Sequence, residues 1–168
     1  MKNFSTIVFS IVFLFLISCE SSSEPETNPA ISISVLSESI NVGSQVEVFV
    51  KIVDFPDDVF AISGRLSFDE NRITISNDQA DWMGNIWSSS AIGFLNIEDG
   101  IIYFSVSQIA GSGNADNQGT SLTIEITADV AGTTSIDLLP SQLSLYDSDG
   151  EELDIDNLDI DGVSLIIE

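Results

Sequence analysis

The sequence has no histidine, one cysteine and only four basic residues among its 168. Histidine is the commonest general base and metal ligand near neutral pH, so catalysis by a Ser–His or Cys–His pair is excluded. The lone Cys19 also excludes an intramolecular disulfide. Paired carboxylates could serve a glycosidase, but 27 acidic residues bring some pair to a suitable distance by chance. We therefore expect that the protein is not an enzyme and that it has no cofactor other than weakly bound calcium.

The shortage of basic residues gives a formal net charge of -23 at pH 7. A field of this sign repels nucleic acids and anionic membrane surfaces, so neither is an expected partner. A charged surface of this kind keeps a soluble protein from aggregating. The 43% hydrophobic content is enough for the core of one domain, and the length leaves no room for a second of similar size. We expect a monomer.

The N-terminal residues have the pattern of an export signal. Lys2 precedes an apolar run from Ile7 to Ile17, which is too short to span a bilayer. The run ends in Leu16-Ile17-Ser18-Cys19, which resembles the lipobox of bacterial lipoproteins. That resemblance implies cleavage before Cys19 and a diacylglycerol on its sulfur. We therefore expect a signal peptide over residues 1–18 and an exported lipoprotein, anchored in the outer membrane or at the cell surface through Cys19 alone.

The segment 19–29 is expected to be the lipidated cysteine and a flexible tether. Its letters ESSSEPETNP contain no large apolar residue, and such compositions form linkers without a packed core. Fully extended, the tether reaches about 35 Å. It would hold a single domain, residues 30–168, off the membrane and allow it to reorient.

Residues 30–168 alternate between apolar and polar positions as β-strands do. In 101–107, Ile102, Phe104 and Val106 occupy every second position, and 121–127 repeats the pattern after a loop of Gly, Ser, Asn, Asp and Gln. One dry and one wet face per strand is typical of two antiparallel sheets packed together. Similar runs separated by turn residues recur from 31–35 to 163–167. We expect an all-β sandwich of about nine antiparallel strands.

Three stretches of the chain resemble the cohesin domain, the receptor module of cellulosome scaffolds. The first, VGSQVEVFVKIVDFPDDVFAISGRLSFDENRITI, has the spaced glycines, turn proline and aromatic-Asp turn of that family at Gly43, Pro56, Gly64, Phe68, Asp69 and Ile73. Glu70 stands where the family usually has proline. DGIIYFSVSQIAGSGNADNQGTSLTIEITADVAGTTSIDL and SDGEELDIDNLDIDGVSLII are similar to its middle and its end. The resemblance implies a nine-stranded jelly-roll sandwich whose first and last strands pair, and non-catalytic binding of a dockerin-like protein.

The resemblance also implies a binding face. In cohesins the partner docks on the outer face of one sheet, built from the third, fifth, sixth and eighth strands, which here lie around Ser63, Gly93 to Ile97, Ser105 and Ser144. The expected partner-binding residues on these strands are Ser63, Arg65, Tyr103, Ser105, Ser107, Ser144 and Tyr146. Serine is cheaper to desolvate than a carboxylate, and Tyr and Arg often carry interface energy. An ordinary solvated sheet face is the alternative interpretation.

Trp82 and Trp87 favour a different function, a carbohydrate-binding module of related fold that takes part in polysaccharide capture and breakdown. Such modules stack sugar rings on exposed aromatic faces. Residues an odd number apart on a strand point to opposite faces, so the two rings align only if their segment is irregular. Otherwise they plug an end of the core. A purely structural envelope domain is a third hypothesis.

The acidic C-terminal residues contain a weak calcium pattern. Asn157, Asp159, Asp161 and Glu168 fall at the first, third, fifth and twelfth positions of the EF-hand spacing. The first position is Asn, however, and residues 163–167 alternate as a strand does. The competing interpretation is two turns flanking a two-stranded ribbon, with Asp149-Gly150 as its hairpin turn. Weak calcium binding by the surplus carboxylates remains compatible with it.

Overall fold

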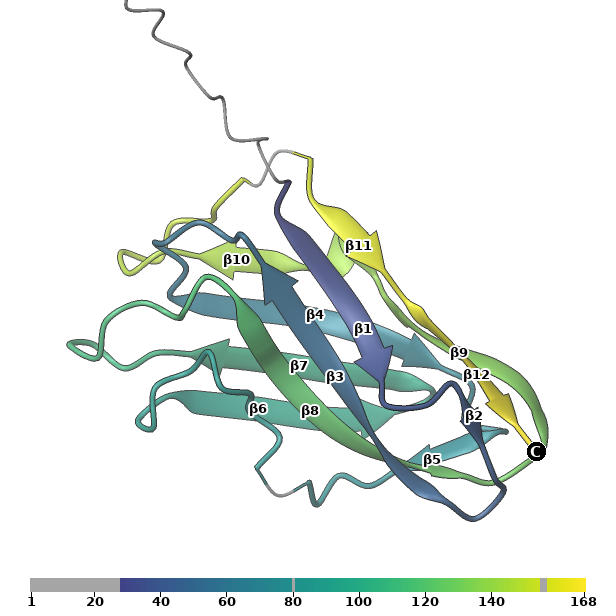
Figure 1. Ribbon diagram of the computed structural model, residues 1–168. Coiled ribbons are helices and arrows are strands. Elements are labelled where there is room, and N and C mark those ends of the chain that lie inside the picture. The colour runs from purple at the N-terminus through teal and green to yellow at the C-terminus, as the bar shows by residue number, and fades with distance from the viewer. Residues whose placement is uncertain (1–27, 80, 155–156) are drawn as a thin grey trace, which may run out of the picture.

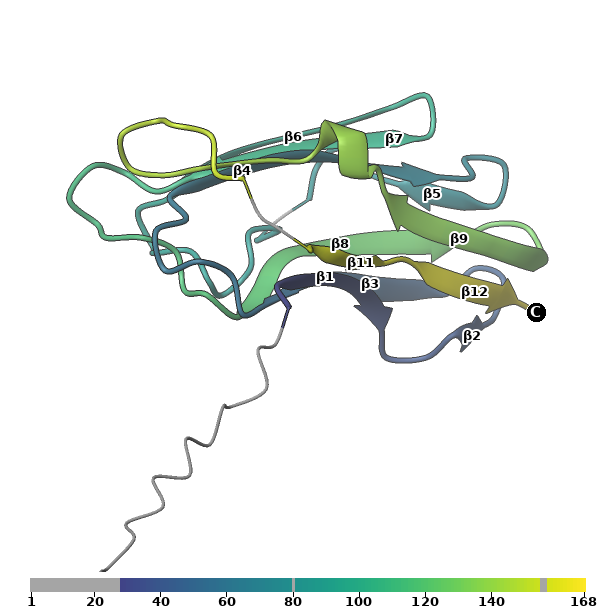
Figure 2. The same ribbon diagram turned by 90° about the horizontal axis from the view of Figure 1, so that it is seen from above.

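The computed structural model describes residues 28–79, 81–154 and 157–168. These residues form two β-sheets packed face to face (Figures 1 and 2). The strands are β1 (Ala30–Val35), β2 (Ser39–Ile40), β3 (Gln45–Val53), β4 (Ala61–Phe68), β5 (Ile73–Ile75), β6 (Ile92–Glu98), β7 (Ile101–Ser107), β8 (Gly119–Ala128), β9 (Gly132–Leu138), β10 (Ser144–Tyr146), β11 (Asp159–Asp161) and β12 (Val163–Ile167). A short 3-10 helix, η1 (Pro140–Gln142), separates β9 from β10. The all-β sandwich is confirmed.

The number of strands differs from the nine expected. The described residues contain twelve, because the structure adds segments such as β2 and β11, which have two and three residues. Strands this short do not complete an apolar–polar alternation, so the pattern does not predict them. Within the same residues, no helix is long and apolar enough to cross a membrane.

The two sheets are joined through the C-terminal strands. One sheet has the order β11-β1-β3-β8-β5, and the other runs β2-β12-β9-β4-β7-β6 with β10 also beside β4. The expected pairing of the first strand with the last strand, 163–167, differs in the structure, because β1 pairs instead with β11, which lies parallel to it. The chain then crosses to the other sheet, where β12 lies antiparallel to β9 and parallel to β2. Most other neighbours in the two sheets are antiparallel.

The core lies between the sheets and is filled by alternate residues of the strands. From β3, Val48, Val50 and Ile52 are each 1% exposed, and Ile62 and Leu66 of β4 are equally buried. Burying such a side chain contributes about 1.5–3 kcal/mol, and a slip of one residue would turn a whole strand's apolar set outward. All buried apolar residues of the described chain lie between Ile31 and Ile167. Residues 28–168 therefore carry their own core.

One edge of β4 is covered by a strand broken in two. β9 pairs with Leu66–Phe68, and β10 pairs with Ala61–Ser63 further along the same edge. Pro140 has no backbone N–H to donate to a ladder, and here the chain turns through η1 before it resumes as β10. The break places residues of η1 beside the outer surface of the sheet.

A tight turn fixes β6 against β7. Asp99 and Gly100 have positive φ angles of 50° and 72°, as a two-residue hairpin turn of type I′ requires. The resulting register sets Phe94 opposite Ser105 and Ile92 opposite Ser107. Since Leu95 and Ile97 pack against the core, alternation turns Ile92 and Phe94 to the outer surface.

Candidate binding face

The outer surface of β10, β4, β7 and β6 brings together the seven residues predicted to bind a partner. Ser63 lies opposite Ser144 on one side and Ser105 on the other. Arg65 lies opposite Tyr103, and Ala61 lies between Tyr146 and Ser107. Because cross-strand neighbours point to the same side of a sheet, these side chains share one surface. We call it the serine face, comprising Ser63, Arg65, Tyr103, Ser105, Ser107, Ser144 and Tyr146 together with Ile92 and Phe94.

Arg65 and Tyr103 form a stacked pair on the serine face. The guanidinium carbon of Arg65 lies 5.0 Å from the centroid of the Tyr103 ring. A cation over a ring face contributes about 0.5–1 kcal/mol at an exposed site, which fixes the orientation of an otherwise flexible side chain. Among the described residues the one ion pair joins Arg72 to Asp69. Arg65 thus keeps its donors available for an acceptor on another molecule.

Ile92 and Phe94 are functional candidates that were not predicted from the sequence. Their side chains are 62% and 61% exposed, which is unusual for large apolar residues placed on one strand. Phe94 stands between two shallow hollows. One of about 200 Å³ is lined by Ile92 and two serines, and the other, of about 330 Å³, is lined by Arg65, Tyr103 and residues of η1. A signal was present, since alternation with Leu95 and Ile97 places both residues outward.

The serine face is nearly free of charge on a strongly acidic chain. Arg65 is its one charged residue, and none of the 27 acidic residues belongs to it. Removing hydroxyl groups from water costs far less than removing carboxylates. Exposed apolar residues rimmed by polar ones mark sites of protein interaction. The surface can therefore be covered by another molecule at a low desolvation cost.

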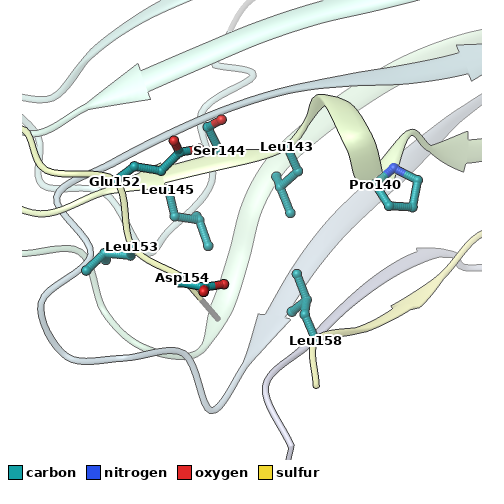
Figure 3. A pocket seen from close by; sticks show the side chains of 8 residues that line it. All are labelled: Pro140, Leu143, Ser144, Leu145, Glu152, Leu153, Asp154 and Leu158. Carbon is teal, nitrogen blue, oxygen red and sulfur yellow. The ribbon is translucent and has the colours of Figure 1, made fainter. Parts of the chain in front are cut away.

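A leucine-lined cleft lies beside the serine face, behind β10. It has a volume of about 520 Å³ and is lined by Leu143, Leu145, Leu153 and Leu158, with Pro140, Ser144, Glu152 and Asp154 around them. Figure 3 shows Leu143, Leu145 and Leu158 directed toward a common space. Ser144 also lines the larger hollow of the serine face, so the two concavities adjoin. Residues 155 and 156, between Asp154 and Leu158, lie outside the described residues.

The two tryptophans do not share an exposed surface. Trp87 is 8% exposed, and its indole N–H bonds to the backbone of β8. Trp82 is half-buried, and its ring packs so closely on Gly93 that a Cβ there would lie 2.7 Å from it. The segment follows the edge of β8, where Trp82 O accepts from the backbone N–H of Thr123, and this turns Trp87 inward. Trp87 therefore plugs one end of the core, as in the competing interpretation. This corrects the expectation that its ring stacks on a sugar.

The four calcium candidates are spread along an extended chain. Asp159 and Asp161 lie in β11, paired with Ala30 and Ser32, while Asn157 precedes this strand and Glu168 follows β12. Since strands rise about 3.3 Å per residue, Asn157 and Glu168 lie at opposite ends and do not close a loop. In the described part of the chain no three acidic, Cys or His residues are grouped to hold a metal ion. The expected turn at Asp149-Gly150 is present, closed by Asp147 and Glu151.

The expected lipidation site, Cys19, lies outside the described residues. Pro29, at the end of the expected tether, belongs to the described residues. Pro29 O accepts a hydrogen bond of 2.9 Å from the backbone N–H of Asp159, so the chain is already attached to the domain one residue before β1 begins.

Comparison with known proteins identifies related domains. The model of the cohesin domain family matches residues 30–164. A type II cohesin domain from the cellulosome of Acetivibrio cellulolyticus has a TM-score of 0.71 at 14% identity, over 83% of this chain and 95% of its own. A non-cellulosomal cohesin from the archaeon Archaeoglobus fulgidus gives 0.66 at 17%, over 84% and 92%.

A complex is also among the similar structures. The third cohesin of ScaC from Acetivibrio cellulolyticus, solved with the ScaB dockerin, has a TM-score of 0.68 at 21% identity, over 83% of this chain and 98% of its own. No curated protein matches the sequence. At these identities the structural similarity establishes the fold alone.

Proposed function

Because the chain belongs to the cohesin domain family, we propose that it binds a protein module of the dockerin type through the serine face. The binding is non-catalytic. The observation that supports this proposal is the composition of the serine face. It combines exposed apolar residues, a stacked Arg–Tyr pair and several serines on a chain of net charge -23. The ScaC cohesin of similar fold was solved with a dockerin, which supports a protein as the partner.

The side chains of the serine face fall into two roles. Phe94, Tyr103 and Arg65 surround the larger hollow, and these residue types carry much of the energy at protein interfaces. The serines around them supply hydroxyl groups that can donate or accept as the partner requires. A partner that places an apolar side chain against Phe94 and an acceptor near Arg65 would use both. The interface would be anchored at its centre and adaptable around it.

We also propose that the domain is displayed at the cell surface by a lipid on Cys19. The order of Lys2, an apolar run from Ile7 to Ile17 and a cysteine directly after Ser18 supports this. The polar segment between Cys19 and Pro29 would separate the domain from the membrane. A tether of this length lets the serine face turn toward a partner in solution.

The direct test is capture followed by a measured affinity. Residues 28–168 are immobilised, proteins secreted by the source organism are passed over them, and the captured protein is titrated against the same domain by calorimetry. We expect saturable binding that is lost in Ser105→Asp, because a carboxylate at the centre of the serine face must then be desolvated. Val42→Asp adds the same charge at a site that is 48% exposed and outside the face, and it should bind normally.

Two results would contradict the proposal. Equal affinity of Ser105→Asp and the unmodified domain would place the contact elsewhere. Retention on insoluble polysaccharide, with no protein captured, would favour the carbohydrate-binding alternative instead.

A further inference from the structure

β6 differs from the other strands at the sheet margins of the described chain. The margins formed by β2, β5 and β11 have two or three residues each, whereas β6 has seven. Proteins protect exposed strand edges because unpaired backbone groups recruit further strands. Short margins need little protection. β6 is long enough to accept a partner strand.

Asn77 protects one end of β6. Its side-chain oxygen accepts from the backbone N–H of Ile97 at 2.6 Å, and its amide nitrogen donates to Ile97 O at 3.1 Å. The backbone groups of Ile97 therefore face away from β7. Since this orientation alternates along an antiparallel strand, the groups of Leu95 and Gly93 face the same way. No backbone or side-chain bond from the described residues reaches them.

The open part of β6 lacks the charges, prolines and bulges that usually protect a strand edge, and Trp82 and Met83 contact Gly93 on the core side of the strand. Residues 92–97 contain no charge and no proline, and the side chains of Ile92 and Phe94 are exposed. Lysine, proline or a bulge at this position would discourage pairing. On a chain with 27 acidic residues, this stretch is a neutral, apolar edge.

We propose that β6 pairs antiparallel with β6 of a second copy of this chain, centred on Phe94. In this register Gly93 of each copy lies opposite Leu95 of the other. Both residues of such a pair exchange N–H and C=O groups, so the two pairs form four hydrogen bonds. The two Phe94 rings face each other as a close cross-strand pair. Ile97 takes no part, because Asn77 already holds its backbone groups.

The occupant is a second copy because the open edge complements itself. Two outward backbone positions placed symmetrically about Phe94 match their own two-fold image, as an isologous dimer interface requires. Charge also permits pairing at this edge, since residues 92–97 carry none on a chain with 27 acidic residues. Glu98 lies beyond the paired residues. The serine faces of the two copies would then lie side by side in one continuous sheet, which departs from the monomer expected from composition.

Net charge makes this association dependent on salt. Two copies that each carry a large negative charge repel one another. Raising sodium chloride from about 0.01 M to about 1 M shortens the screening length from about 30 Å to about 3 Å. The dimer should therefore become tighter with added salt. Contacts that rely on ion pairs respond in the opposite way, because salt weakens them.

Hydrogen exchange of residues 28–168, followed by NMR at micromolar and millimolar concentration in high salt, tests the pairing. We expect the amides of Gly93 and Leu95 to exchange at least about tenfold more slowly at the higher concentration. The amide of Ile97 should be protected at both concentrations. Sedimentation should show a monomer–dimer equilibrium. Phe94→Glu should abolish it by opposing two carboxylates, and Ile166→Glu, which adds the same charge on β12 at a residue 51% exposed, should not.

The proposal is overturned if exchange at Gly93 and Leu95 is independent of concentration and sedimentation finds a monomer throughout. Dimers that persist in Phe94→Glu would place the contact between copies elsewhere. These readouts need no partner protein, so they stand apart from the test of the serine face.

Discussion

The indole N–H of Trp87 donates a hydrogen bond of 2.8 Å to the backbone carbonyl oxygen of Ser121 in β8. The same oxygen accepts from the backbone N–H of Gly84 at 2.9 Å. Two donors on one carbonyl fasten the irregular segment before β6 to the edge of the other sheet. The Trp87 ring thereby closes one end of the core.

Trp87→Ala should lower the free energy of unfolding by about 3–5 kcal/mol, because it leaves a cavity where a large buried side chain was. Trp82→Ala should cost less, since that ring is only half-buried. Urea denaturation of both variants measures the difference. A Trp87→Ala domain of normal stability that has lost an affinity for polysaccharide would instead show that the ring serves binding.

Gly64 is required by the ring opposite it. A Cβ at this position would lie 2.6 Å from Cζ of Phe104 on β7, and Phe104 is 3% exposed. Gly64→Ala should therefore destabilise the domain by about 1–3 kcal/mol through overpacking. Ser63→Ala, one residue away on the outer surface, is the control and should change stability little. Adding Phe104→Leu to Gly64→Ala should restore part of the loss, and no restoration would refute this cause.

The sequence predicted those strands whose side chains alternate over several residues. The ranges expected for β7 and β12, 101–107 and 163–167, match the observed bounds, because their apolar residues face a core that tolerates no slip. β11 was missed. Its residues Asp159, Ile160 and Asp161 read as an acidic turn, and its pairing with β1 depends on a strand far away in the sequence.

The candidate site was predicted in part for the same reason. Ser63 and Arg65 had to face outward once Ile62 and Leu66 faced inward. Phe94 was overlooked because an exposed ring contradicts the usual rule of burial. The orientation of Trp87 could not be predicted from the apolar–polar alternation of its own segment. It follows from a hydrogen bond to Ser121 in β8, which is distant in the sequence.

Asp69 gives the domain a defined response to acid. Its carboxylate accepts from the backbone N–H of Asn71 at 3.0 Å and from its side-chain amide at 3.1 Å. These bonds, with Arg72 nearby, hold the pKa of Asp69 below its ordinary value of 3.8. A carboxyl group with a lower pKa in the folded state stabilises the fold above the unfolded value, and this stability is lost as the pH falls through the folded pKa.

Asp69→Asn should therefore make the stability of the domain depend less on pH below about 4. Carbon-detected NMR titration of Asp69 and urea denaturation across that range measure both sides of the linkage. Glu70→Gln removes the adjacent carboxylate, which accepts no hydrogen bond from the residues that the structure describes, and serves as the control. An Asp69 that titrates at or above its ordinary pKa would contradict this account.

Cys19→Ala should remove the proposed lipid anchor. Two acyl chains, with each buried CH₂ contributing about 0.8 kcal/mol, hold a protein on a membrane without a spanning helix. In cell fractionation, the Cys19→Ala protein should appear in the soluble fraction or remain unprocessed, while Ser22→Ala in the tether should stay anchored. A Cys19→Ala protein that is cleaved yet still membrane-bound would rule out the lipoprotein interpretation.

Arg65→Ala, Tyr103→Ala and Phe94→Ala should each weaken partner binding by about 1 kcal/mol or more. All three side chains point away from the core, so the melting temperature should change little. The double variant at Arg65 and Tyr103 should lose less than the sum of the two single losses, because each residue orients the other. Calorimetric titration with the captured partner gives these values.

The other sheet provides a matched control for that experiment. Lys51 lies over the ring of Phe49 at 5.8 Å on the outer surface of β3, so Lys51→Ala removes a cation stacked on an aromatic ring without touching the serine face. If Lys51→Ala binds normally while Arg65→Ala does not, the partner docks on β4 and β7. If Arg65→Ala and Tyr103→Ala keep full affinity, the partner contacts another surface, such as the loops around Trp82 or Asn114. The docking mode of cohesins would then not apply to this chain.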